Sequence, residues 1–345
     1  MTRLARALSL AIGLAAPLPA LAKDPPVSYV APQRLAVATP AGVVGQLPLL
    51  LSQDWSAPLP AVTRAVITVH GLTRDVENYQ RAAEKALAAS GIDPATVLLV
   101  APQFLDDGDV EAHQLPQETL RWSHTGWEGG DDAHGPAPIS SFAAFDAILA
   151  KLADRSLFPA LAQVVVAGHS GGGQVVQRYA VALRGDAALI KAGVKDVHYV
   201  VANPSSYVYF SPERPAGKGF ARPADGCPEY DKWKYGMHGL PPYMAGRDAA
   251  ALEAAYVARP VTYLLGTADT DPAHPALDKS CAAEAQGPDR HSRGVAYLRY
   301  LQWRHPTGLS HRQVDVPGVG HSGDKMFGST CGVAAVYGTA GCDGR

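Results

Sequence analysis

The fold is decided by one stretch of this sequence, Gln163-Val164-Val165-Val166-Ala167-Gly168-His169-Ser170-Gly171-Gly172. Its first five residues form a short, valine-rich apolar run, which predicts a strand buried on both faces of a sheet. Residues Gln174 to Leu183 carry apolar side chains at helical spacing, so a helix should follow closely. The glycine-rich segment between them predicts a sharp turn from strand to helix.

Ser170 stands at the centre of this turn, with Gly168 and Gly172 two residues to either side. A serine that acts as a nucleophile has to be raised on a strained turn, where side chains on these two neighbours would collide. The N-terminus of the following helix would stabilise negative charge that develops beside the serine. The alternative is a glycine-rich helix start with an ordinary capping serine. Because strand, motif and helix follow in the required order, we interpret Ser170 as a nucleophile and Gly171 as an oxyanion N–H donor.

Apolar strand-like runs alternate with helix-length segments through most of the chain, which predicts a mostly parallel central sheet with helices on both faces. The clearest strands are 65–69, 96–101, 163–167, 197–202 and 261–265. Two earlier runs, 34–38 and 44–51, could form an antiparallel edge. Besides the helix after Ser170, helices are expected at 77–89, ended by Gly91, and from a cap at Ser140-Ser141 to about Leu152.

Two long segments interrupt this alternation, at 103–138 and at about 203–258. The second is rich in aromatic residues and lies before the strand at 261–265. It suits a lid-like insertion over an apolar substrate, or a disulfide-anchored insertion whose aromatic side chains form a small core of their own. In the first segment, Trp122 and Trp127 either line an acyl pocket or fix the loop to the sheet.

The strand, turn and helix around Ser170 resemble those of the α/β-hydrolase superfamily, particularly its serine esterases and lipases. The resemblance covers roughly residues 61–327. It implies an α/β-hydrolase fold and a catalytic triad in the order serine, acid, histidine. The strand 261–265 continues into Gly266-Thr267-Ala268-Asp269, which is similar to the turn that carries the family's acid. The segment that ends at His321 resembles the late turn that presents its histidine.

The resemblance therefore implies the triad Ser170, Asp269 and His321. Asp271 and Asp278 follow in the same loop as Asp269 and remain alternatives for the acid.

The turn His70-Gly71-Leu72-Thr73 resembles the family's oxyanion turn and points to the Leu72 N–H as the second donor, with Gly171 as the first.

These residues imply a hydrolase that cleaves carboxylic esters of small or medium size through an acyl-serine intermediate. A serine peptidase or amidase with the same triad is an alternative. A cutinase-like polyester hydrolase is another, although those enzymes usually carry Met where Gly171 follows the serine. A non-catalytic binding protein on the same fold is the alternative from a different class.

We expect neither a cofactor nor a metal. The acidic residues Asp106, Asp107 and Asp109 lack EF-hand spacing and suit a solvated turn. The histidines and aspartates of the 103–138 segment lack the spacing of a zinc motif. Those residues are His113, His124, His134, Asp131 and Asp132.

The composition restricts the other classes. The chain has 345 residues, 47% hydrophobic and 18% charged, which is enough apolar content for a large core. Lys and Arg number 30 against 32 Asp and Glu, and this net charge of -2 gives no general electrostatic reason to bind nucleic acid or an anionic membrane.

The first 22 residues have the features of a secretory signal peptide: Arg3 and Arg6, an apolar run from Leu8 to Leu18, and small residues at Ala20 and Ala22. We therefore expect a secreted or periplasmic protein whose residues 23–345 form a single domain with an insertion at about 203–258. No other stretch is apolar enough to predict a membrane span.

Four cysteines follow in the C-terminal part, and an even number in an exported chain favours disulfides. Three pairings are possible. Proximity in sequence favours Cys331 with Cys342, which leaves Cys227 with Cys281.

Overall fold

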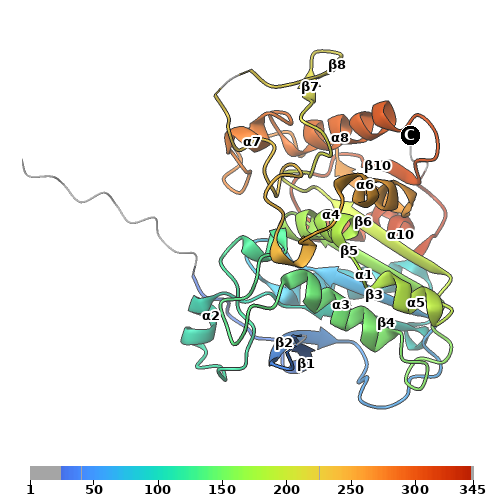
Figure 1. The fold of residues 1–345 in the computed structure, drawn as a ribbon. Coiled ribbons are helices and arrows are strands. Elements are labelled where there is room, and N and C mark those ends of the chain that lie inside the picture. Colours follow the sequence, from blue (N-terminus) through green and yellow to red (C-terminus); the bar gives the residue numbers. More distant parts are fainter. Residues whose placement is uncertain (1–24, 40, 225, 343–345) are drawn as a thin grey trace, which may run out of the picture.

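The computed structural model describes residues 25–39, 41–224 and 226–342, and the predicted signal peptide lies outside these residues. Within them, an eight-stranded sheet forms the centre of the fold in the order β1-β2-β4-β3-β5-β6-β9-β10 (Figure 1). Its strands are β1 (Gln33–Ala38), β2 (Val44–Leu51), β3 (Arg64–Val69), β4 (Val97–Pro102), β5 (Gln163–His169), β6 (Asp196–Ala202), β9 (Val261–Gly266) and β10 (His311–Val316). A separate hairpin pairs β7 (Arg214–Ala216) with β8 (Gly219–Ala221).

The six strands from β4 to β10 in the sheet order run parallel, and β1 and β2 are antiparallel at one edge. This confirms the predicted mostly parallel sheet and its antiparallel edge. The five strands predicted most clearly agree with the observed ones to within two residues at each end. At the opposite edge, β10 was not among the strands predicted most clearly, because its sequence mixes buried and partly exposed positions instead of forming a continuous apolar run.

Helices cover both faces of the sheet. Alternate residues of each strand point to opposite faces, so each face has its own set of side chains that pack against helices. On β3, Ile67 belongs to a core cluster that includes side chains of α3, α4, α6 and α8, whereas Val66 belongs to a second cluster with α1, α9 and α10. The first four helices are α3 (Ser141–Leu152), α4 (Gly171–Ala182), α6 (Ala249–Ala258) and α8 (Arg290–Arg304). The other three are α1 (Val76–Ser90), α9 (Gly323–Gly328) and α10 (Thr330–Tyr337).

The shorter elements lie in the connections. They are α2 (Asp107–Ala112), α5 (Asp186–Lys191), α7 (Cys281–Glu284), and the 3-10 turns η1 (Pro94–Thr96), η2 (Gly126–Gly129) and η3 (Pro242–Met244).

The helix ends follow their capping signals. Gly91 ends α1 in the left-handed conformation, at φ 71°, and the Ser140 side chain accepts a hydrogen bond from the Phe142 N–H at the start of α3. The helix after Ser170 begins at Gly171, three residues before the predicted start. Part of the segment expected to be irregular forms α6.

The aromatic residues of the 203–258 segment mostly pack inside the protein. Tyr207 and Tyr209 are fully buried, with ring centroids 4.5 Å from Tyr297 and Tyr300 of α8, respectively. These rings form a small core between the segment and α8. Tyr235 instead lines the cavity at Ser170.

The two tryptophans of the 103–138 segment are fully buried and fix that loop. Trp122 Nε1 donates to the Ile139 carbonyl at 3.2 Å, and Trp127 Nε1 donates to the His124 carbonyl at 3.0 Å. Neither lines the cavity at Ser170.

The acidic turn is not fully solvated as predicted. Asp106 caps α2, while Asp109 is fully buried and its Oδ2 lies 2.7 Å from Arg74 Nε. The Asp109 carboxylate is therefore buried in an ion pair with Arg74, whereas the prediction placed it in solvent.

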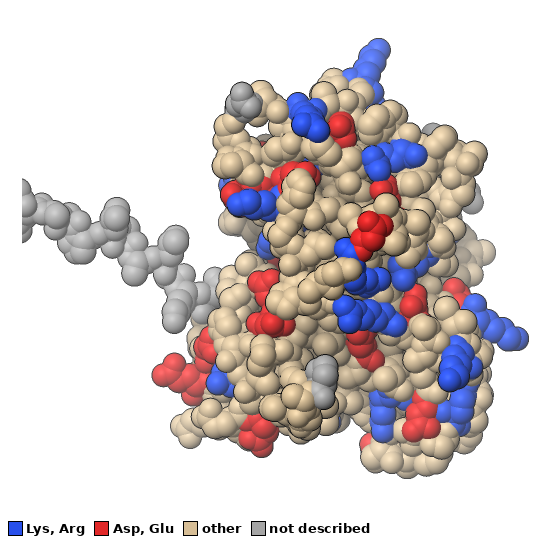
Figure 2. Space-filling model, in the orientation of Figure 1, with Lys and Arg blue, Asp and Glu red and all other residues tan. Residues whose placement is uncertain are grey.

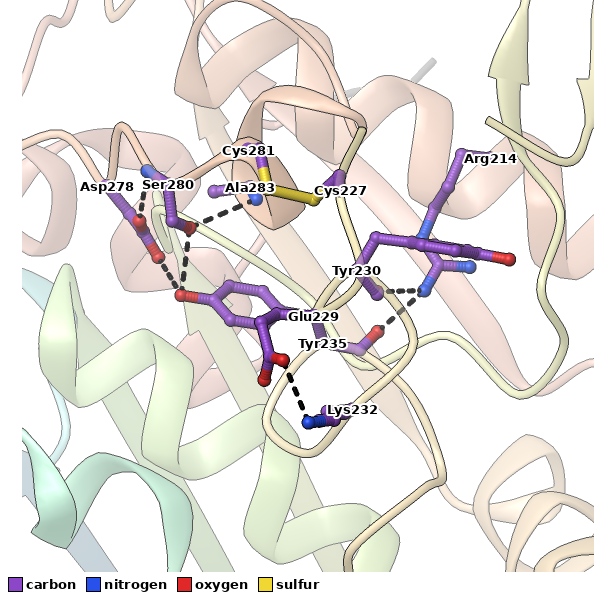
Figure 3. The surroundings of a disulfide bond; sticks show 10 residues. All are labelled: Arg214, Cys227, Glu229, Tyr230, Lys232, Tyr235, Asp278, Ser280, Cys281 and Ala283. Atoms are coloured by element: carbon purple, nitrogen blue, oxygen red, sulfur yellow. Dashed lines mark hydrogen bonds and ion pairs between the residues drawn. A yellow bond between two sulfur atoms is a disulfide. The ribbon is translucent and has the colours of Figure 1, made fainter. Parts of the chain in front are cut away.

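Both predicted disulfides are present. Cys331–Cys342, the C-terminal disulfide, joins the start of α10 to the segment that follows this helix. Cys227–Cys281, the pocket disulfide, joins the 203–258 segment to α7 (Figure 3). Beside it, the Tyr235 hydroxyl donates to Asp278 Oδ2 at 2.7 Å, so a covalent and a polar link hold the same two segments together.

Acidic and basic side chains are interspersed on the face seen in Figure 2, in keeping with the nearly balanced composition. In the part of the chain that the structure describes, no helix is long and apolar enough to cross a membrane.

Candidate active site

Ser170 occupies the strained turn between β5 and α4, at φ 59° and ψ -122°. A side chain at Gly168 would collide with the Gly172 carbonyl, and one at Gly172 would collide with the carbonyl oxygens of Val69 and His70. These two positions therefore require glycine, because the turn brings backbone against backbone. The result is a serine held at the C-terminal end of β5, at the start of a buried helix.

His321 and Asp269 meet Ser170 at this edge of the sheet. His321 Nε2 lies 2.9 Å from Ser170 Oγ, and His321 Nδ1 lies 2.8 Å from Asp269 Oδ2. The three residues come from the ends of β5, β9 and β10, which are parallel strands whose carboxyl ends share one edge. They form one continuous hydrogen-bonded chain from carboxylate through imidazole to hydroxyl.

The two alternative acids lie elsewhere. Asp271 is exposed, and its Oδ1 accepts a hydrogen bond from the Ala273 N–H at 2.8 Å. Asp278 bonds to the Tyr235 hydroxyl in the cavity wall. Asp269 is thus the carboxyl of this loop that contacts the imidazole.

Backbone hydrogen bonds hold the loops of Asp269 and His321 against each other. The Ala268 N–H donates to the Val319 carbonyl at 3.0 Å, and the Gly266 N–H donates to Asn203 Oδ1 at 2.8 Å. Asn203 follows β6, so one side chain links the ends of neighbouring strands beside the triad.

Arg290, at the start of α8, contacts Asp269 from the side away from His321. Its buried guanidinium Nη1 lies 3.4 Å from Asp269 Oδ1, and its Nε donates to Ser205 Oγ at 3.0 Å. A buried carboxylate without a partner is costly, and this guanidinium compensates its charge.

Burial lowers the pKa of His321, which the hydrogen bond to Asp269 partly counteracts, while the positive charge of Arg290 lowers this pKa further. The rings of His169 and His274 pack against it, with centroids 4.6 and 5.0 Å away. A lowered pKa favours the neutral imidazole, which is the form that accepts a proton.

His70 orients the turn after β3. Its Nδ1 lies 2.7 Å from the Gly71 carbonyl oxygen, while its Nε2 accepts from the Phe104 N–H at 2.9 Å. The ring is fully buried, and desolvation lowers its pKa to about 4, so it is neutral and Nδ1 carries the proton. Holding the Gly71 carbonyl directs the Leu72 N–H to the opposite side of the same peptide plane.

The N–H groups of Leu72 and Gly171 lie close together, since a Cβ at Gly171 would be 3.3 Å from the Leu72 nitrogen. Across residues 25–39, 41–224 and 226–342, neither N–H donates to another group of the chain. Both line the cavity at Ser170, as an oxyanion hole requires.

A cavity of about 330 Å³ adjoins Ser170, and its lining is more polar than predicted. Its charged residues are Glu128 of η2, Lys234 and Asp278. The Lys234 ammonium lies 3.1 Å from Glu128 Oε2. The aromatic composition of the 203–258 segment suggested an apolar wall, but most of its rings pack into the core and leave these polar groups at the surface of the cavity.

Sequence reasoning missed Arg290, Asn203 and the pair formed by Glu128 and Lys234. Glu128 and Lys234 are 106 residues apart, and no local motif marks either. Asn203 had one usable signal, because it follows a predicted strand directly at the edge where the triad was expected.

Comparisons with known proteins support the fold. No family model and no curated protein matches the chain. Among solved structures it is similar to a poly(3-hydroxybutyrate) depolymerase from Bordetella parapertussis, with 22% identity and a TM-score of 0.59 over 87% of this chain and 86% of that one. It is also similar to poly(aspartic acid) hydrolase-1 from Sphingomonas sp. KT-1, with 21% identity and a TM-score of 0.57 over 86% and 96% of the two chains. With the observed sheet, these likenesses establish an α/β-hydrolase fold.

Proposed function

We propose that this chain, which has the α/β-hydrolase fold, is a serine hydrolase that cleaves carboxylic esters through an acyl-serine intermediate. The observation that carries the proposal is the hydrogen-bonded chain from Asp269 through His321 to Ser170. Fold alone does not give function, but this arrangement on a strained turn beside the N–H groups of Leu72 and Gly171 supports nucleophilic catalysis.

In the first half of the proposed reaction, His321 Nε2 takes the proton of Ser170 as Oγ attacks the ester carbonyl carbon. Asp269 stabilises the imidazolium and keeps the ring oriented. The N–H groups of Leu72 and Gly171 donate to the oxyanion of the tetrahedral intermediate. The imidazolium then gives its proton to the leaving alcohol as the carbon–oxygen bond breaks, which leaves an acyl-serine.

In the second half, His321 takes a proton from water, and the resulting nucleophile attacks the acyl carbonyl carbon. A second tetrahedral intermediate forms in the same oxyanion hole. Its collapse returns the proton to Ser170 Oγ and releases the carboxylic acid.

We further propose that the reaction takes place outside the cytoplasm. Two disulfides within the described part of the chain favour an oxidising compartment, and this agrees with the signal peptide expected at residues 1–22. The 203–258 segment is then an insertion that shapes the substrate cavity, to which it contributes Lys234 and Tyr235.

Labelling with a fluorophosphonate, combined with turnover of a short-chain ester, tests the nucleophile. The Ser170→Ala variant should lose the label and roughly 10⁴-fold or more in kcat while keeping its thermal transition. Ser156→Ala, which changes an exposed serine on the loop before β5, should keep both labelling and turnover. Near wild-type turnover by Ser170→Ala would reject the proposal, and absence of both labelling and turnover in the unmodified protein would favour a binding protein.

Substrate panels separate the remaining alternatives. Faster cleavage of an anilide than of the ester with the same acyl group would favour a peptidase or amidase. A polyester film in the same panel tests the depolymerase alternative, which the structural likeness to the Bordetella enzyme makes worth including.

A further inference from the structure

Lys234 is the only cation among the described residues that line the cavity at Ser170. Its side chain is 22% exposed, and its ammonium donates one hydrogen bond, to Glu128 Oε2 at 3.1 Å. An ammonium has three N–H donors, so two remain for a molecule in the cavity.

Arg178 already compensates much of the charge of Glu128. This guanidinium is fully buried, with its Nη1 3.9 Å from Glu128 Oε2 and 3.1 Å from the Glu128 carbonyl oxygen. Two cations therefore share this one carboxylate, and Glu128 uses only part of the hydrogen-bonding capacity of Lys234.

Two aspartates, Asp278 in the cavity lining and Asp131, add negative charge to this region without pairing directly with Lys234. Asp278 accepts from the Tyr235 hydroxyl at 2.7 Å and from the Ser280 N–H at 3.0 Å. Within the described ranges, neither Asp278 nor Asp131 has an ion pair with Lys234 or Arg178 within 4.0 Å. Because neither carboxyl bonds to the ammonium, direct hydrogen bonds from Lys234 remain open to a molecule in the cavity, and the preference depends on these bonds and not on a net positive field.

The charged pair lies beside the position where the reacting carbonyl would bind. A Cβ at Gly171 would be 2.7 Å from Glu128 Oε1, so the Glu128 carboxylate fills the space that a side chain after Ser170 would take. The Gly171 N–H is one of the two proposed oxyanion donors. A group a few bonds from the ester carbonyl therefore comes within reach of Lys234.

We propose that Lys234 selects acyl groups that end in a carboxylate, so that the preferred substrates are monoesters of short dicarboxylic acids. This inference rests on the proposed esterase function. A substrate carboxylate replaces solvent at the two unused N–H donors and forms charge-assisted hydrogen bonds. An acyl group that ends in an ammonium has no acceptor for the Lys234 N–H groups, and an alkyl end would leave the polar lining without partners.

Three ethyl esters of similar length test the proposal: monoethyl glutarate, ethyl 5-methylhexanoate as its neutral analogue, and ethyl 5-aminopentanoate. Hydrolysis is followed by chromatography of the released acid. We expect kcat/KM for the glutarate monoester to exceed that of the neutral ester by about tenfold or more, which is the lower range for a hydrogen bond to a charged group.

Variants then assign this preference to one side chain. Lys234→Met should lower the ratio of glutarate to neutral-ester kcat/KM by about tenfold, mainly through KM, and Lys234→Arg should keep most of the ratio. Lys232→Met is the matched control, because Lys232 lies two residues away, is exposed and pairs with Glu229. It should leave the ratio unchanged.

The outcomes distinguish the two proposals. Turnover of the neutral ester without a preference for glutarate, a preference for the aminopentanoate, or an unchanged ratio in Lys234→Met would overturn the selectivity while the esterase function stands. Failure to cleave any of the esters, together with no fluorophosphonate labelling, would reject both.

Discussion

Replacing Asp269 with asparagine tests the proposed mechanism at its least obvious residue. The substitution keeps the size of the side chain and removes its charge. His321 Nδ1 lies 2.8 Å from Asp269 Oδ2, so imidazolium and carboxylate face each other directly when the proton moves. Asp269 is almost fully buried, at 3% exposure, which limits screening by solvent.

Two effects set the expected magnitude. Opposite charges about 4 Å apart interact by about 4 kcal/mol at an effective dielectric constant of about 20, which corresponds to roughly 10³-fold in rate. The asparagine amide could also donate to His321 Nδ1, which would move the ring proton to Nε2 and prevent that atom from accepting the Ser170 proton. Loss of the correct tautomer costs roughly 10⁴-fold in serine hydrolases with this triad. We therefore expect Asp269→Asn to lower kcat/KM by about 10³- to 10⁴-fold.

The assay is steady-state hydrolysis of a short-chain ester, with thermal unfolding to verify the fold. Asp271→Asn is the control, because it makes the same chemical change two residues away at an exposed carboxyl. It should retain activity within about twofold, as expected for a surface substitution. A loss of less than about tenfold in Asp269→Asn, or an equal loss in Asp271→Asn, would refute the role that the geometry gives to Asp269.

Three further results are expected. Because a general base acts in its neutral form and burial lowers the pKa of His321, kcat/KM should rise with pH to a plateau, with its midpoint below the ordinary histidine value of 6.5; a midpoint clearly above 6.5 would contradict this. Removing the pocket disulfide with Cys227→Ser and Cys281→Ser should cost about 4 kcal/mol of stability by the chain-entropy model and should raise KM. Loss of the C-terminal disulfide should cost about 3 kcal/mol and leave KM unchanged. Equal effects of the two changes on KM would disprove the link between the pocket disulfide and the cavity. Gly172→Ala should abolish turnover or soluble expression because its Cβ would meet two carbonyl oxygens, so a stable, active variant would show that the turn can relax.

The central strands could be predicted from sequence because each is buried on both faces. A run such as Val164 to Ala167 leaves little choice of structure once a helix follows it. In contrast, β10 lies at the sheet edge and alternates buried and partly exposed side chains. The α8 helix was missed because its buried face includes Arg290 and Arg293, whose charges are satisfied by distant carbonyl and carboxylate groups.

The histidine and the serine of the site each had a local signal, but the acid did not have a unique one. Asp269, Asp271 and Asp278 share one loop, and the choice among them depends on the direction that the chain takes after β9. Hydrogen bonds between this loop and the turn before His321 set that direction, as in the Ala268 N–H to Val319 carbonyl bond. Such pairing between distant segments has no trace in the local sequence.

The 203–258 segment shows why composition alone misjudged the cavity. Its aromatic content suggested contact with an apolar substrate, but a tyrosine can be buried in the core as readily as it can line a pocket. Tyr207 and Tyr209 pack on Tyr297 and Tyr300, about 90 residues further along the chain, and Trp233 donates to the Gly129 carbonyl at 2.6 Å. The rings anchor the segment, and the residues held between the anchors reach the cavity.

The buried charges around the site follow from the same arrangement. Asp269 has to lie behind His321, away from water, where a carboxylate alone would be destabilised. Arg290 compensates this carboxylate from the opposite side, at 3.4 Å, while its own remaining N–H groups donate to Ser205 and to the Ala276 carbonyl in the cavity wall. The guanidinium that compensates the acid thus also holds the loop that borders the substrate cavity. Geometry at the triad and the shape of the cavity therefore depend on one side chain, and a change at Arg290 should alter both together.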